Sequence, residues 1–118
     1  MLATAAAGCT GGGPSTTIDR EETVEPGSFV ELNLLMNASA ELTYRWTTTP
    51  ETALGFDIHT HEGGEVDYRQ QAETTSHEGS FTAPSQGTYS LQWHNPSDEP
   101  VTVEMHLEGA FTLESTAP

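Results

Sequence analysis

The sequence contains no lysine, and its 118 residues include three arginines, Arg20, Arg45 and Arg69. Acidic residues number 18, so the formal net charge at pH 7 is −15. A surface this acidic repels phosphate backbones and anionic lipid headgroups, which argues against nucleic acid as a partner. The charge would suit solubility at high salt or attraction of cations. Its less specific interpretation is that it reflects the environment of the organism.

Cysteine is almost absent, and the one present, Cys9, stands in a distinctive setting. Ala6-Ala7-Gly8 precedes it, and a stretch rich in glycine, serine and threonine, residues 10–17, follows. This arrangement resembles the cleavage box and tether of bacterial and archaeal lipoproteins, with Ala6 where leucine is commoner. The resemblance implies that Cys9 is lipidated outside the cytoplasm, with residues 1–17 as signal remnant and flexible tether. It supposes an upstream start, because residues 1–8 are too short for a charged region and an apolar segment. The alternative is an unstructured tail with an incidental thiol.

Long apolar runs and helical periodicity are also missing. No stretch is apolar for long enough to span a bilayer, so we expect membrane association through the lipid anchor only. No segment keeps a helical period over two turns. Short segments with a period of two occur instead, separated by proline, glycine and asparagine. These features favour strands and turns.

The clearest strand signal lies in residues 78–95. Phe81 precedes a breaker cluster, residues 83–87, that suits a tight reversal. Beyond it Tyr89, Leu91 and Trp93 alternate with polar residues, as in a half-buried strand. Asn95-Pro96 then closes the strand, because proline has no N–H to donate to a ladder. The aromatic face predicted here needs a second layer to cover it.

Other alternating segments supply that layer. Their apolar sets are Leu42/Tyr44/Trp46, Leu54/Phe56/Ile58 and Val101/Val103/Met105/Leu107. About eight short strands at near-regular spacing predict an all-β fold, an antiparallel β-sandwich. We expect the domain to cover residues 18–114, with a disordered tail at 115–118. Both tryptophans, Trp46 and Trp93, fall on apolar faces, which favours core packing over an exposed aromatic platform for sugars.

The order of these pieces resembles the GOLD (Golgi dynamics) domain. The pattern F-x-A-P-x-x-G-x-Y-x-L-x-W-x-N runs from Phe81 to Asn95, and the alternating strand from Val101 to Met105 follows it. The resemblance implies a jelly-roll-like sandwich that recognises proteins or lipids without catalysis. Eukaryotic cargo receptors of this family carry a cysteine pair in the domain, a coiled coil and a membrane helix. This chain lacks all three, so cargo sorting does not transfer.

Histidines provide the candidate metal ligands. His59 and His61 leave the same face of a predicted strand about 7 Å apart, a workable spacing for two ligands of copper or zinc. His94 would join them if its strand is a neighbour, and Glu62 and His77 are weaker candidates. The alternative is that these histidines face solvent and bind nothing.

Motifs for catalysis are absent from the sequence. It contains no G-x-S-x-G elbow, no glycine-rich phosphate loop and no H-E-x-x-H. We therefore expect a protein that is not an enzyme. Asn37-Ala38-Ser39 matches the N-x-S sequon, which matters only in a glycosylating host.

Two functions remain open. The first is an extracytoplasmic binding or assembly module, anchored at Cys9, that recognises another protein of the cell envelope. The second is an extracytoplasmic copper- or zinc-binding protein that uses His59, His61 and His94.

Overall fold

The computed structural model describes residues 15–60 and 66–117, with the backbone alone for residues 66–72 and 117. In these ranges the chain forms nine strands and no helix, so no helix there is long and apolar enough to cross a membrane. The strands are β2 (Thr16–Val24), β3 (Phe29–Met36), β4 (Glu41–Thr49), β5 (Leu54–Thr60), β6 (Val66–Thr74), β7 (Ser76–Thr82), β8 (Gly87–His94), β9 (Val101–Gly109) and β10 (Thr112–Ala117).

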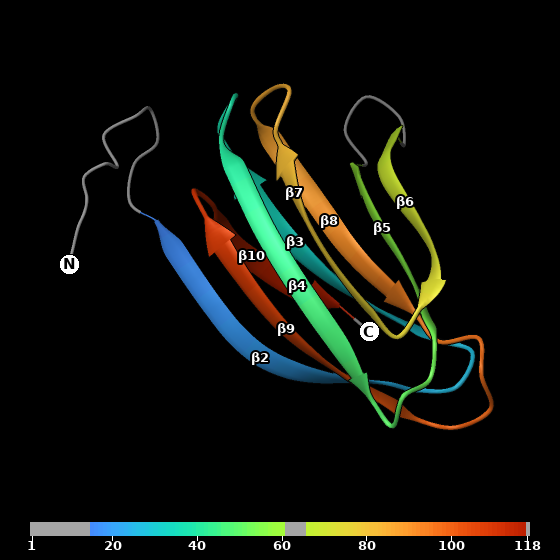
Figure 1. Cartoon of the computed structure of the whole chain (residues 1–118). Coiled ribbons are helices and arrows are strands. Elements are labelled where there is room, and N and C mark those ends of the chain that lie inside the picture. Colours follow the sequence, from blue (N-terminus) through green and yellow to red (C-terminus); the bar gives the residue numbers. More distant parts are fainter. Residues whose placement is uncertain (1–14, 61–65, 118) are drawn as a thin grey trace.

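The strands form two antiparallel sheets that pack face to face (Figure 1). One has the order β10-β3-β8-β5-β6 and the other β2-β9-β4-β7. Strand β2 pairs with β9, β3 with β8, β4 with β7 and β5 with β6. The chain from β2 to β9 is therefore one long hairpin wound into a jelly roll, with β10 added at one edge. This confirms the predicted antiparallel β-sandwich.

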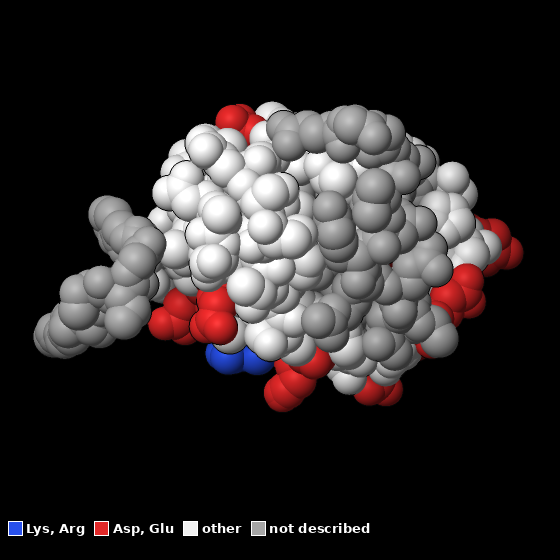
Figure 2. Space-filling model, turned by 90° about the horizontal axis from the view of Figure 1, so that it is seen from above, with Lys and Arg blue, Asp and Glu red and all other residues white. Residues whose placement is uncertain are grey.

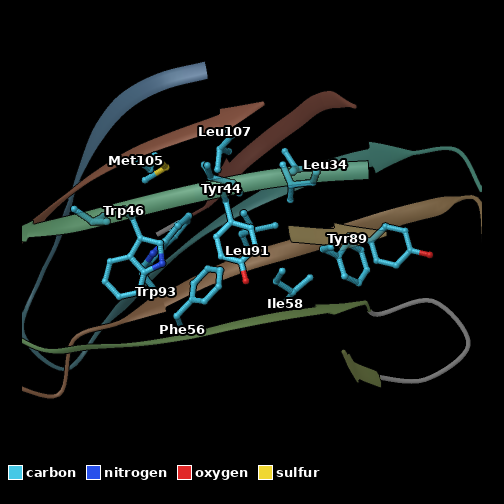
Figure 3. Packing of buried hydrophobic residues seen from close by; sticks show 14 of the residues in the cluster. Leu34, Tyr44, Trp46, Phe56, Ile58, Tyr89, Leu91, Trp93, Met105 and Leu107 are labelled. Carbon is cyan, nitrogen blue, oxygen red and sulfur yellow. The ribbon is translucent and has the colours of Figure 1, made fainter. Parts of the chain in front are cut away.

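Side-chain alternation produces the core between the sheets. In β4, Leu42, Tyr44 and Trp46 are buried while the residues between them are exposed. Trp46 and Trp93 meet edge-to-face with ring centroids 6.4 Å apart, and Phe56 lies 5.2 Å from Trp93 (Figure 3). Such geometry is favoured by aromatic quadrupoles and adds to the free energy gained from apolar burial. Both tryptophans are core residues, as their spacing predicted.

The reversal after Phe81 connects the two sheets rather than closing a hairpin. Strand β7 is an edge strand of the four-stranded sheet, whereas β8 lies within the five-stranded sheet. The Tyr89 hydroxyl donates to the Ser85 carbonyl at 2.6 Å, and the Ala83 N–H donates to the Ala40 carbonyl at 2.9 Å. These bonds fix the crossing without any pairing between β7 and β8.

The ends of the domain lie further out than the sequence suggested. Strand β2 begins at Thr16, inside the expected tether. The expected disordered tail is wrong for residues 115–117, because β10 continues to Ala117 and pairs with β3. The chain here is held by backbone hydrogen bonds at a sheet edge, and its side chains are mostly polar, so no apolar pattern marks it.

Candidate functional site

His59, the first predicted metal ligand, lies on the outer face of the five-stranded sheet but is not open to solvent. It is 2% exposed. Its Nδ1 lies 2.5 Å from Oδ1 of Asp57 on the same strand, and its Nε2 lies 3.0 Å from Oε2 of Glu31 on β3. We refer to Glu31, Asp57 and His59 as the His59 cluster. The expectation of a solvent-facing imidazole is therefore corrected.

The His59 cluster links strand β3 to strand β5. Strand β8 lies between β3 and β5, so the Glu31 side chain crosses it to reach His59. Ser90 on β8, directly opposite His59, is fully buried, and its hydroxyl donates to Asn33 Oδ1 at 2.5 Å. Ser90 is thus a structural group and is not exposed as a nucleophile, although it neighbours an Asp–His pair.

Both ring nitrogens of His59 face carboxylate oxygens. An ionised carboxylate only accepts hydrogen bonds, so an imidazolium, with a proton on each nitrogen, satisfies both contacts. A metal ion would need a nitrogen lone pair of the neutral ring. The arrangement is therefore suited to holding strands together by charge-assisted hydrogen bonds and poorly suited to ligating a metal.

The other predicted ligands do not converge on His59. His94 lies opposite Gly55 and His59 opposite Ser90, four residues along the paired strands, or about 13 Å. His77 lies in the other sheet, with its Nε2 3.3 Å from the Tyr44 hydroxyl.

Cys9, His61 and Glu62 lie outside the described residues. Among the residues that are described, no group of three or more His, Cys, Asp or Glu side chains is arranged to hold a metal ion.

The outer face of the four-stranded sheet carries a different arrangement, which the sequence did not single out. Six acidic side chains project from it and define what we call the acidic face: Asp19, Glu21, Glu41, Glu78, Glu104 and Glu108. Acidic atoms lie along the lower margin of the molecule in Figure 2, with basic atoms among them, and further acidic atoms lie at the top and right of the view. Cross-strand pairing of alternating residues places these groups on one surface.

Arg45 stands in the middle of the acidic face. On β4 it lies opposite His106 of β9 and Glu78 of β7. Two open hollows, of about 430 and 310 Å³, share Arg45 and His106 in their walls. His106 is engaged, because its Nδ1 lies 2.5 Å from Asp19 Oδ1 and its Nε2 lies 3.5 Å from Glu108 Oε1.

The Arg45 guanidinium, by contrast, has no ion pair or hydrogen bond within the described part of the chain. It is exposed, between two hollows and among carboxylates. Five donors in a planar fork are thus available to a ligand or partner. Among the described side chains of the five-stranded sheet, the exposed large apolar ones are Phe29 and Leu35, 40% and 36% exposed, and single apolar side chains of this kind are common on protein surfaces.

No protein-family model and no curated protein matches the chain. A solved de novo designed double-stranded β-helix is 14% identical, with a TM-score of 0.46, over 76% of this chain and 97% of its own. A family two carbohydrate esterase from Cellvibrio japonicus is 15% identical, with a TM-score of 0.47, over 89% of this chain and 36% of its own.

Proposed function

We propose that the chain is a non-enzymatic extracytoplasmic binding module, anchored at Cys9, that recognises another envelope protein through the acidic face. The unpaired Arg45 between two open hollows is the observation that carries this proposal. Arginine is enriched among the residues that dominate binding energy, because its fork recognises carboxylates with two parallel hydrogen bonds. The partner we infer presents a carboxylate to Arg45 and basic residues to the surrounding acidic side chains.

The position of the proposed anchor fits this orientation. Thr16, the first residue of β2, follows Cys9 by seven residues, a span of at most about 25 Å. Strand β2 is an edge strand of the four-stranded sheet and contributes Asp19 and Glu21 to the acidic face. A lipid on Cys9 would therefore keep that face close to proteins embedded in the same membrane.

Site-specific photo-crosslinking tests the proposed face. A photoreactive residue at Thr43 or Thr47, both exposed on the outer face of β4, should give one discrete protein adduct in intact cells. The same residue at His94, exposed on the opposite sheet, is the matched control and should give none. Comparable adducts from both faces would reject the acidic face as the binding surface.

Arg45→Glu should abolish the Thr47 adduct, because it replaces the guanidinium proposed to bind the partner with a seventh carboxylate. Arg45→Lys keeps the charge but loses the fork, so we expect a several-fold weaker adduct. Thermal unfolding of Arg45→Lys should match that of the unsubstituted protein, since Arg45 is exposed and unpaired within the described residues. Arg45→Glu places a carboxylate opposite Glu78, so we expect a small loss of stability in that variant. An undiminished adduct in Arg45→Glu would remove Arg45 from the proposal.

Lipid anchoring has its own test. Cys9→Ser should move the protein from the membrane fraction to the soluble fraction, because the thiol is the only attachment point for a thioether-linked lipid. Mass spectrometry of the unsubstituted protein, extracted from membranes, should show a lipid-sized increase on the peptide that contains Cys9. A soluble protein with an unmodified Cys9 would refute the anchor without bearing on the acidic face.

A further inference from the structure

The turn between β3 and β4 presents an asparagine that the fold does not use. Asn37 is exposed, and neither its side chain nor that of Ser39 makes a hydrogen bond within the described residues. The turn is held by backbone bonds instead: the Ala40 N–H donates to the Asn37 carbonyl at 3.0 Å, and the Ser39 N–H donates to the Ala83 carbonyl at 2.8 Å. Both side chains are therefore free for another role.

Ser39 occupies a backbone conformation that does not favour serine. Its φ is +70°, in the left-handed region where glycine and asparagine are preferred because a Cβ atom crowds the backbone. The Ser39 side chain makes no hydrogen bond within the described residues that would offset this strain. Backbone strain at an exposed residue is a recognised sign of a functional constraint.

The remaining asparagines are committed to the fold. Asn33 donates from Nδ2 to the Ser115 hydroxyl at 2.9 Å. Asn95 is fully buried and donates from Nδ2 to the Val24 carbonyl at 2.8 Å, and Pro96 follows it, which excludes Asn95-Pro96-Ser97 as a glycosylation sequon. Asn37-Ala38-Ser39 is thus the one N-x-S site in the chain.

We propose that Asn37 is an acceptor for an N-linked glycan and that the Ser39 hydroxyl is retained for recognition by the glycosylating enzyme. The donor class is an oligosaccharide esterified to a lipid phosphate. The bond from the sugar C1 to Asn37 Nδ2 forms as the bond from C1 to the phosphate oxygen breaks. The lipid phosphate leaves with the electron pair, and Nδ2 gives up one proton. The inference rests on the extracytoplasmic location in the proposed function.

The glycan would stand at the end of the sandwich from which the tether leaves. Leu42, near the start of β4, and Thr16, at the start of β2, both lie opposite Gly109. The turn at Asn37 immediately precedes β4, and Arg45 lies further along that strand. A sugar chain here would therefore project beside the tether and leave the centre of the acidic face open.

Peptide mass spectrometry tests the inference on the full-length protein purified from its own cells. Trypsin cleaves after Arg20 and Arg45, so residues 21–45 form one peptide that contains Asn37, with Asn33 as an internal control. We expect this peptide to carry added sugar mass, assigned to Asn37 by fragmentation. Asn37→Gln and Ser39→Ala should both abolish the addition, and Ser39→Thr should keep it.

Ser39→Gly separates this role from a structural one. It removes the hydroxyl and relieves the left-handed strain, so the glycan should be lost while the denaturation midpoint rises. A glycan retained in Ser39→Gly would overturn the role of the hydroxyl. If protease added to intact cells digests the protein, and peptide 21–45 is unmodified, the inference is overturned and the proposed function stands. An unmodified protein retained in the cytoplasm would overturn both.

Discussion

Replacing His59 with alanine is expected to lower the free energy of unfolding by about 3 kcal/mol at pH 7. The substitution removes the cation between Asp57 and Glu31, whose side chains are only 25% and 14% exposed. Asp57 and Glu31 then lose the imidazole between them on a partly desolvated surface, which is more costly than losing an exposed ion pair. Urea denaturation measures the loss. The transition midpoints of the two proteins are compared, together with the slope of the unfolding free energy against urea concentration.

His94→Ala provides the matched control for His59→Ala. His94 lies on the outer face of the same sheet but is exposed, so its loss should change the unfolding free energy by no more than about 0.5 kcal/mol. Glu31→Gln should fall between the two, because His59 keeps its contact with Asp57. Equal effects of His59→Ala and His94→Ala would mean that the cluster contributes nothing beyond a surface histidine.

The His59 cluster also marks the limit of what the sequence could predict. A period of two correctly separated the inner residues of a strand from the outer ones, because the direction of a side chain is a local property of the backbone. Trp46 and Trp93 are buried as that period required. It also placed His59 on the outside, but an outer side chain need not be exposed. Its contact with Glu31 depends on the strand register, which brings Glu31 to it from two strands away.

Register is a long-range property, and no local pattern in this chain encodes it. The sequence could suggest that His94 and His59 lie on neighbouring strands, and β5 and β8 are indeed neighbours. The pairing of Gly55 with His94 then separates the two rings along the strands. The acidic face also depends on register, because Arg45 lies opposite His106 and Glu78 through pairings between strands that are far apart in the sequence. Only the assembled sheets show that its guanidinium is unpaired.

Gly109→Ala is expected to destabilise the protein by about 3 kcal/mol, because the end of β9 has no room for a side chain. A Cβ atom on Gly109 would lie 2.1 Å from the Glu41 carbonyl oxygen and 3.0 Å from Leu42 Cα. Both are backbone atoms of β4, so the contact cannot be relieved by rotating a side chain. The Glu41 carbonyl also accepts a hydrogen bond from the Ala110 N–H at 3.2 Å, which the displacement would break.

Gly27→Ala is the control that separates the steric clash from the conformational strain in Gly109→Ala. Gly27 also has a positive φ, +71°, but a Cβ atom there would meet nothing within 4 Å. Its replacement should cost only the conformational strain, about 1 kcal/mol. Because Gly109 lies opposite both Leu42 of β4 and Thr16 of β2, the larger effect should also speed hydrogen exchange at the start of both strands. Equal destabilisation by the two alanines would show that β4 yields to the added methyl group and that close packing at this junction is not required for the fold.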